Sequence, residues 1–244
     1  IYIQEQNSIP GSTNRLLARY KKIDKIFCGF PKTQDFFEEK KAIFSGNLIN
    51  LNAQKVVKKK PCSGELDIKI MGGSLGARLI NKTAPKVFSQ LSQDFPDFKF
   101  ILSHQCGKGN LEETKSYYDS CKKNFDLKLF EFVESMESFY SNADLIISRA
   151  GALSVSEICE TQNIAIFIPL KNSIDNHQHE NAKFLAEKNS AFICEEDLLE
   201  ENLKKILFEI VKNPEILEKM KKNISRISLT DKKNIIVKKI LSNE

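Results

Sequence analysis

Two glycine-bearing segments of this chain, each set between an apolar run and a helical pattern, could bind a phosphorylated ligand. The first is Gly72–Arg78, which follows the apolar run Ile68–Met71, and the second is Ser148–Glu157, which follows Asp144–Ile147. A strand that turns tightly into a helix leaves backbone N–H groups of the first helical turn unpaired, and such groups attract anions. Two such junctions in one sheet indicate a site for a nucleotide sugar.

The first segment contains Gly72, Gly73 and Gly76. The absent side chains would let a phosphate approach the backbone, and Ser74 could donate its hydroxyl to a phosphate oxygen. The glycine spacing differs from the dinucleotide fingerprint, and the next apolar run does not end in the acid that binds the ribose of NAD. No Gly-Lys-Ser/Thr follows, so the segment is not a P-loop. A tight strand–helix turn without a ligand is the alternative.

The second segment carries a carboxylate, Glu157, three residues after Ser154. This spacing fits a capping box, in which the two side chains satisfy N–H groups at the start of a helix. Alternatively, the carboxylate accepts hydrogen bonds from both hydroxyls of a ribose. The two roles can partly coexist if the helix begins nearer Gly151.

A polar stretch after a later apolar run, Asp175–Asn181, could contact a sugar. Asp175 is placed to act as the N-cap of a helix. His177, Gln178 and Asn181 would then share one helical face, which presents amide and imidazole groups to hydroxyls. A metal site formed by the two histidines of the stretch is less favoured, because side chains two residues apart on a helix point apart. A solvated helix start is the third interpretation.

From residue 66 onward, apolar runs of strand length alternate with helical patterns. The expected strands are Asp67–Met71, Lys99–Ser103, Leu127–Phe132, Asp144–Ser148, Ile164–Pro169 and Ala191–Cys194, and the expected helices lie near 77–92, 110–124, 135–142, 152–162 and 177–188. This alternation indicates an α/β fold with a parallel sheet covered on both faces. Right-handed crossovers place the carboxyl ends of the strands, and hence the glycine turns, along one edge. His104 would lie at this edge, and we expect a hydrogen-bonded structural histidine there.

The two ends of the chain differ from this alternating region. Before residue 45 we expect a strand at Ile1–Ile3, a helix at Gly11–Tyr20 and a strand at Lys25–Cys28, and after Glu195 the pattern is purely helical. Because the first residues already resemble a strand, we expect an N-terminal portion to be missing. The expected domains are a remnant of an N-terminal lobe (1–45), a linker (46–65), a ligand-binding C-terminal lobe (66–230) and a final helix that packs back on the N-terminal lobe (231–244).

Composition limits the class of protein further. The 244 residues are 41% hydrophobic and 28% charged, which is typical of a globular protein, and no apolar run has the ~20 residues of a membrane span. The six cysteines form no CxxC pair and indicate reduced thiols in a cytosolic protein, with neither a disulfide frame nor a zinc site. Recurrent lysine pairs favour either a solvated surface or attraction to an anionic membrane. Without a basic stripe interleaved with aromatic residues, nucleic acid is not an expected partner.

Several segments, taken in order, resemble the MurG family of bacterial glycosyltransferases, which adds GlcNAc to undecaprenyl-pyrophosphoryl-MurNAc-pentapeptide during peptidoglycan synthesis. They are Glu5–Gly11 with Asn14–Ala18, Gly72–Arg78, His104–Lys108, Ser148–Ile158 and Asp175–Ala182. The resemblance implies a two-lobed GT-B fold, with UDP-GlcNAc held mainly by a Rossmann-type C-terminal lobe and with no cofactor or metal. It also implies a peripheral location at the cytoplasmic face of the bacterial inner membrane.

The resemblance implies roles for individual residues that would bind the nucleotide. Glu157 would bind the ribose, and Ser74 with its glycine loop would bind the diphosphate. Val133, which follows Phe132, would offer backbone groups to the uracil.

The resemblance also implies residues that would bind the sugar. Gln178, with His177 beside it, would contact the GlcNAc hydroxyls, and Asn7 would reach the donor from the other lobe. The implied reaction is an inverting transfer to the 4-hydroxyl of MurNAc, in which the two helix N-termini stabilise the charge that grows on the diphosphate.

The chain departs from the family pattern at three places. Gln4 stands where the family has histidine, and Asn50 replaces an arginine that contacts phosphate in the family. The N-terminal glycine-rich motif GGTGGH is absent, together with most of the acceptor lobe. The family's candidate catalytic base belongs to that absent region, so the sequence identifies no catalytic residue.

Three other functions remain open. The first is another UDP-sugar enzyme of GT-B fold, such as a glycolipid synthase or a 2-epimerase. The second is a non-catalytic donor-binding lobe that works only with a partner chain. The third, a Rossmann dehydrogenase, is disfavoured by the missing ribose-binding acid.

Overall fold

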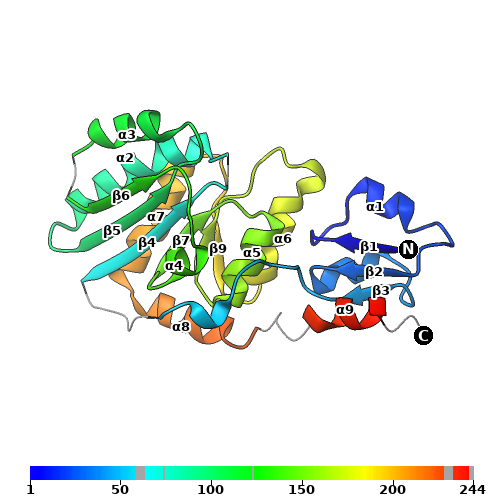
Figure 1. Cartoon of the computed structure of the whole chain (residues 1–244). Coiled ribbons are helices and arrows are strands. Elements are labelled where there is room, and N and C mark those ends of the chain that lie inside the picture. Colours follow the sequence, from blue (N-terminus) through cyan, green and yellow to red (C-terminus); the bar gives the residue numbers. More distant parts are fainter. Residues whose placement is uncertain (59–63, 74, 123, 228–232, 242–244) are drawn as a thin grey trace.

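Two parallel sheets are built from separate parts of the chain (Figure 1). The computed structural model describes residues 1–58, 64–73, 75–122, 124–227 and 233–241. The small sheet has the strand order β1-β2-β3, and the large sheet has the order β6-β5-β4-β7-β8-β9. All strand pairs are parallel, which confirms the predicted α/β class.

The small lobe comprises the elements of the first sheet: β1 (Tyr2–Glu5), α1 (Ser12–Leu17), β2 (Lys25–Cys28), the short 3-10 helix η1 (Pro31–Phe36) and β3 (Ala42–Phe44). Its own core consists of the buried side chains of Ile3, Ile23, Ile26, Cys28 and Ala42. The sequence did not predict β3, because three apolar residues behind the charged run Glu38–Lys41 are too short a pattern to identify a strand.

The large lobe follows the 3-10 helix η2 (Ala53–Lys55). Its strands are β4 (Glu65–Met71), β5 (Lys99–Gln105), β6 (Asp126–Phe130), β7 (Leu145–Ser148), β8 (Ala165–Phe167) and β9 (Ala191–Ile193). Its helices are α2 (Arg78–Asp94), α3 (Leu111–Asp119), α4 (Met136–Tyr140), α5 (Ala152–Glu160), η3 (Ile174–Asn176), α6 (His177–Ala186), α7 (Leu199–Lys212) and α8 (Glu215–Ile224), and α9 (Lys233–Leu241) follows them. The six predicted strands are present, although β6 ends at Phe130 and not at Phe132.

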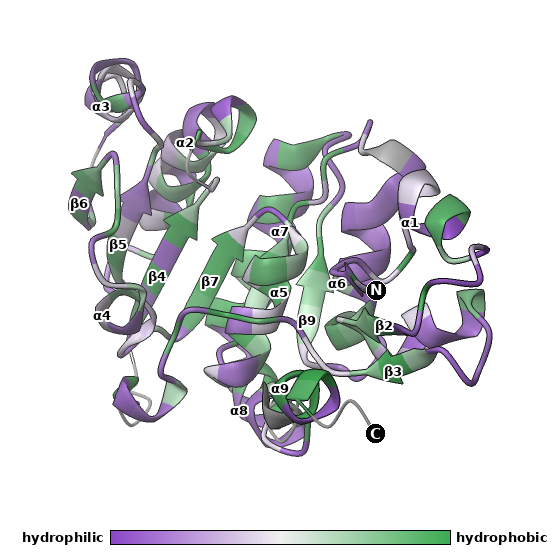
Figure 2. Ribbon diagram, turned by 45° about the vertical axis from the view of Figure 1, so that its right-hand side comes forward, coloured by the Kyte–Doolittle hydropathy of each residue, from purple (hydrophilic) through white to green (hydrophobic). Residues whose placement is uncertain are grey.

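The strands of the large sheet are apolar because helices cover both faces of the sheet. α2 packs against α3 and α7, whereas α5 packs against α6. At the centre of the sheet Ile68, Ile70 and Ile147 have no exposed surface. Figure 2 shows the strand residues mostly in hydrophobic green and the outer sides of the helices largely in purple.

Each covering helix contributes one apolar side. In α7 the buried residues recur at helical spacing: Leu199, Leu203, Leu207 and Ile210. The described helices include none that is long and apolar enough to cross a membrane.

The strand order places one reversal at the centre of the large sheet. The chain steps from β4 through β5 to β6 at one edge, returns through α4 to β7 beside β4, and then steps to β9 at the other edge. Met71, the last residue of β4, is paired with Ser148, the last residue of β7. The carboxyl ends of these two strands therefore meet at the topological switch point, where open α/β sheets bind ligands.

A buried asparagine of α6 joins the two lobes. Asn181 has no exposed surface, and its Oδ1 accepts a hydrogen bond from the Ser8 N–H at 2.8 Å. Its Nδ2 donates to Asn7 Oδ1 and to the Ala150 carbonyl, each at 3.2 Å. One amide group thus ties the small lobe to the loop that follows β7.

Two further contacts continue this connection. Asn47 Nδ2 donates to the Gln6 carbonyl at 3.0 Å and to Ser156 Oγ in α5 at 2.9 Å. Phe30 of the small lobe meets Phe184 of α6 edge to face, with ring centroids 5.3 Å apart. Polar and aromatic contacts therefore hold the small lobe against α5 and α6.

Replacing Asn181 by Ala should lower the free energy of unfolding by about 1–3 kcal/mol, because the buried N–H of Ser8 loses its acceptor. Asn213→Ala is the matched control, since among the described residues its side-chain amide bonds only to the exposed Glu209 side chain (3.3 Å). This control should change stability by less than about 0.5 kcal/mol. Urea denaturation measures both, and equal losses would contradict the role of Asn181.

Candidate functional site

The loop after β4 depends on two glycines for close backbone packing. A Cβ at Gly72 would lie 2.2 Å from the Ala77 nitrogen, and one at Gly76, where φ is +75°, would lie 2.0 Å from the Cys106 carbonyl oxygen. α2 then begins at Arg78 without a side-chain cap. Its first N–H groups are therefore left for solvent or a ligand. Ser74, the predicted phosphate donor, lies outside the described residues.

Side chains at the end of β5 and at the start of α3 fix this glycine loop. Gln105 Nε2 donates to the Gly73 carbonyl at 3.0 Å and to the Glu131 carbonyl at 2.8 Å. Asn110 Nδ2 donates to the Leu75 carbonyl at 3.1 Å. Gln105 thus connects the predicted phosphate loop with the segment that carries Val133, a role that its position at a strand end did not reveal.

His104 is a structural histidine, as the sequence predicted. It is fully buried, with Nδ1 2.9 Å from the Tyr118 hydroxyl and Nε2 3.0 Å from Asn81 Oδ1. Burial lowers the pKa of His104 to about 3, so the ring is neutral. Asn81 in turn donates to the Cys106 carbonyl at 2.9 Å, so this network holds the loop that packs against Gly76.

The second junction places Glu157 inside α5. This helix begins at Ala152, with Gly151 as an N-cap that makes no side-chain hydrogen bond. Ser154 is therefore the third residue of the helix and not its cap, so the capping-box interpretation is wrong. The Glu157 carboxylate instead accepts a hydrogen bond from the Tyr140 hydroxyl at 2.9 Å. Burial raises the pKa of Glu157, while this hydrogen bond lowers it.

The segment after β6 carries the residue predicted to contact the uracil. Val133 is half-buried against the core, and Phe132 before it is 69% exposed. Glu131 anchors the segment: its carbonyl accepts from Gln105 at 2.8 Å, and its carboxylate accepts from the Gly109 N–H at 2.6 Å. The backbone near Val133 is thus held next to the glycine loop.

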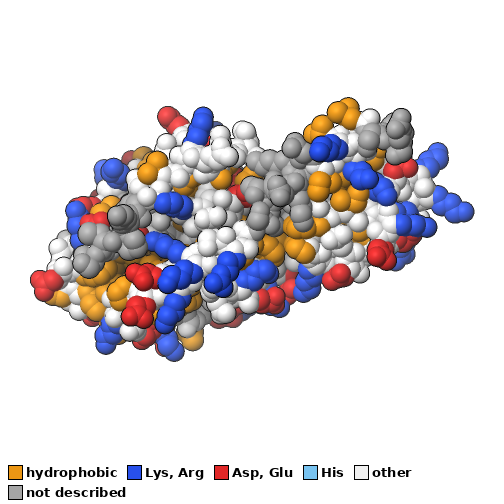
Figure 3. All heavy atoms as spheres, turned by 90° about the horizontal axis from the view of Figure 1, so that it is seen from below, with side chains coloured by type: hydrophobic (Ala, Val, Ile, Leu, Met, Phe, Trp, Pro, Cys, Tyr) orange, Lys and Arg blue, Asp and Glu red, His pale blue; other side chains and the backbone are white. Residues whose placement is uncertain are grey.

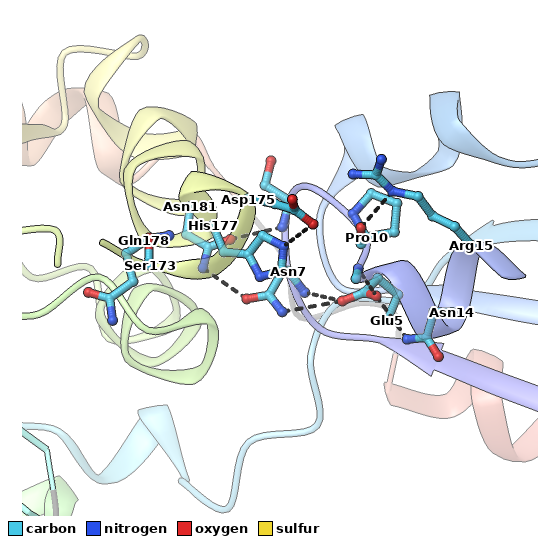
Figure 4. Close-up of polar contacts among 12 residues, drawn as sticks. Glu5, Asn7, Pro10, Asn14, Arg15, Ser173, Asp175, His177, Gln178 and Asn181 are labelled. Atoms are coloured by element: carbon cyan, nitrogen blue, oxygen red, sulfur yellow. Dashed lines mark hydrogen bonds and ion pairs between the residues drawn. The ribbon is translucent and has the colours of Figure 1, made fainter. Parts of the chain in front are cut away.

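At the other end of the site, Asn7 of the small lobe meets the start of α6 (Figure 4). Asn7 Oδ1 accepts from Asn181, and Asn7 Nδ2 donates to Glu5 Oε1 at 3.3 Å. His177 opens α6, and its buried Nε2 has no hydrogen-bond partner among the described residues. It lies 3.6 Å from Asp175 Oδ2. Asn7 of the small lobe is thus bonded to the helix that His177 opens.

The start of α6 differs from the expectation. Asp175 and Asn176 both adopt left-handed backbone, and Asn176 is the N-cap in place of Asp175. Gln178 Oε1 accepts from the Leu170 N–H at 3.1 Å, which ties α6 to the loop after β8. The expectation that Asn181 faces a sugar is wrong, because its amide is buried between the lobes.

Charged side chains near these loops form ion pairs and hydrogen bonds within the protein. Arg149 Nη2 lies 2.6 Å from Glu196 Oε1, and its Nη1 donates to the Ile168 carbonyl at 3.1 Å. His179 Nε2 lies 3.1 Å from Glu195 Oε1. Across the part of the chain that the structure describes, no three His, Cys, Asp or Glu side chains are grouped to hold a metal.

Comparison with known proteins identifies a family that this chain matches. Residues 68–238 match the family described as Glycosyltransferase family 28 C-terminal domain. A UDP-N-acetylglucosamine–N-acetylmuramyl-(pentapeptide) pyrophosphoryl-undecaprenol N-acetylglucosamine transferase of Acinetobacter baumannii is 35% identical over 90% of this chain and 60% of its own length. The protein of the same name from Shewanella denitrificans is 33% identical over 96% and 63%. The chain thus spans about 60% of the length of these curated relatives.

Solved structures agree with this match. The crystal structure of Acinetobacter baumannii MurG has a TM-score of 0.80 and 32% identity, and the match covers 99% of this chain and 67% of that one. A glycosyltransferase of Rickettsia africae, at 14% identity and a TM-score of 0.64 over 100% and 71% of the two chains, shows the shared fold alone. The MurG match confirms the GT-B-like fold that the sequence predicts.

Gly76→Ala should destabilise the protein by roughly 2 kcal/mol or more, because the new Cβ meets a backbone carbonyl at a left-handed position. Gly109→Ala is the matched control: its φ of +77° is equally left-handed, but nothing lies within 4 Å of the added Cβ. The control should lose only about 1 kcal/mol of backbone strain. Equal losses in thermal unfolding would show that the contact with Cys106 does not shape the loop.

Proposed function

The chain belongs to glycosyltransferase family 28, and on that premise we propose that its large lobe (residues 66–230) binds UDP-GlcNAc. The sugar would be transferred to undecaprenyl-pyrophosphoryl-MurNAc-pentapeptide with inversion, in peptidoglycan synthesis. The names of the relatives, which are 33–35% identical to this chain, support this donor and this acceptor.

One observation carries the proposal. β4 and β7 end as a pair at Met71 and Ser148, their loops lead into α2 at Arg78 and α5 at Ala152, and neither helix has a side-chain cap. Their N–H groups would receive the diphosphate of the donor. Glu157, in the second turn of α5, would accept hydrogen bonds from the ribose, and the backbone near Val133 would meet the uracil.

The same arrangement accounts for departure of the leaving group. The acceptor oxygen would attack the anomeric carbon as the bond from that carbon to the UDP oxygen breaks. Negative charge then grows on the diphosphate, where the two helix N-termini stabilise it. The proton of the acceptor hydroxyl must pass to a base, and we assign that role to no residue of this chain.

A second candidate is a donor-binding lobe that acts only with a partner polypeptide. The family match lies at residues 68–238, in the lobe where the donor would bind. Such a lobe would bind the nucleotide sugar without turning it over by itself. Binding is therefore a sharper test of the site than activity.

Titration calorimetry should show UDP-GlcNAc binding in preference to UDP-GalNAc and NADH. Glu157→Gln should weaken UDP-GlcNAc binding by ~1.5–3 kcal/mol, or roughly ten- to 150-fold, because a charged acceptor of the ribose hydroxyls is lost. Glu160→Gln, at the end of the same helix, should leave the affinity unchanged. An unchanged affinity in the Glu157 variant would overturn the ribose assignment, and preference for NADH would overturn the proposed function.

We also propose that the chain acts at the cytoplasmic face of the bacterial plasma membrane, held by anionic lipid headgroups. Lys and Arg exceed Asp and Glu by 37 to 32, which gives a net charge of +5. Figure 3, which views the molecule from below, shows Lys and Arg side chains gathered over the middle of that face. η2 and α8 run along this side and carry the exposed Lys55 and Lys222.

The protein should cosediment with vesicles that contain anionic phospholipid, and added salt should release it. Replacing Lys55 and Lys222 by Gln should weaken the partition coefficient roughly 30-fold, at about 1 kcal/mol for each lysine. The control replaces Lys115 and Lys122, which are also exposed but lie on and after α3. Equal binding to neutral vesicles, or an equal loss in the control, would contradict the assignment.

A further inference from the structure

Tyr140 contacts both the end of β4 and the second turn of α5, although no sequence motif marks it. It is the last residue of α4 and has no exposed surface. Its carbonyl accepts from Asn163 Nδ2 at 3.2 Å, which fixes the end of the helix. Its hydroxyl lies 2.9 Å from Glu157 Oε2 and 3.7 Å from the sulfur of Met71. The hydroxyl thus contacts both the carboxylate of α5 and the last residue before the glycine loop.

We propose that Tyr140 is a positioning residue for the nucleotide: its hydroxyl holds Glu157 Oε2 so that Oε1 accepts hydrogen bonds from the ribose. Within the described part of the chain, no donor is bonded to Oε1. The inference rests on the proposed function, because it takes UDP as the ligand. A carboxylate fixed before the ligand arrives loses less conformational freedom on binding.

Tyr140 also influences the charge of Glu157. Burial raises the pKa of Glu157, the hydrogen bond from Tyr140 lowers it, and the neighbouring carboxylate of Glu137 raises it. Burial also raises the pKa of the Tyr140 hydroxyl, so this group remains a donor at neutral pH. Without the hydroxyl, Glu157 would keep its burial and its acidic neighbour but lose the bond that favours the ionised form. Its pKa would therefore rise further.

The ribose-binding form is the ionised carboxylate, so the affinity for UDP should fall as the pH drops through the pKa of Glu157. Tyr140→Phe should move this fall to higher pH and weaken UDP binding at neutral pH by about three- to tenfold. Tyr118→Phe is the matched control for the pH dependence: it also removes a fully buried hydroxyl, which bonds to His104 and not to Glu157, so the pH at which the affinity falls should stay that of the unchanged protein. Titration calorimetry from pH 5 to 8 compares the affinities of the variants. Protonation of the UDP phosphates affects all variants alike, so it cancels in the ratio of their affinities.

A second nucleotide separates positioning from general loosening of the pocket. With 2′,3′-dideoxyuridine diphosphate, which lacks the ribose hydroxyls, Tyr140→Phe and the unchanged protein should bind equally well. In a Glu157→Gln background, Tyr140→Phe should have no further effect on UDP binding. A wild-type affinity and pH profile in Tyr140→Phe, or an equal loss with the dideoxy nucleotide, would overturn the inference alone. Failure of the unchanged protein to bind UDP would instead overturn the proposed function, and the inference with it.

Discussion

The parallel pairing of β4 with β7 is the constraint on which the site depends. It sets Met71 opposite Ser148, so the loops that lead into α2 and α5 leave the sheet side by side. Fully buried residues of both strands, such as Ile70 and Ile147, fix the register. A shift by one residue would turn each side chain to the opposite face of the sheet, against the wrong helices. Core packing therefore determines how far apart the two uncapped helix N-termini lie.

Buried polar side chains refine this arrangement. Gln105 holds the glycine loop to the segment after β6, and His104 supports the loop that crosses Gly76. Asn181 attaches the small lobe to the loop after β7. Each of these groups makes at least two hydrogen bonds inside the protein, which is what makes a buried amide or imidazole a rigid support. These side chains thus hold the backbone that would receive a ligand, but they would not contact the ligand themselves.

The sequence predicted the large sheet well, because a strand buried on both faces is a nearly continuous apolar run that can be read locally. It also predicted the two strand–glycine–helix junctions, because each glycine segment lies between an apolar run and a helical pattern.

The wrong predictions also have physical reasons. Ser154 and Glu157 have the spacing of a capping box, but spacing does not say where a helix begins, and α5 begins at Ala152.

Local sequence patterns also could not predict contacts between segments that are distant in the chain. Asn181 is 173 residues from Ser8, and the two residues belong to different lobes. Tyr140 of α4 and Glu157 of α5 are 17 residues apart, and no pattern around Tyr140 signals that its hydroxyl points to Glu157. The three residues of β3 form a strand only because β2 is present to pair with them.

The most direct measurement is a crystal structure of this chain with UDP bound. We predict that the diphosphate lies against the N–H groups at the starts of α2 and α5 and that a ribose hydroxyl lies within hydrogen-bond distance of Glu157. The uracil should face the backbone near Val133. UDP bound at another edge of the sheet, or bound here with its ribose turned away from Glu157, would contradict the assignment of this switch point as the donor site.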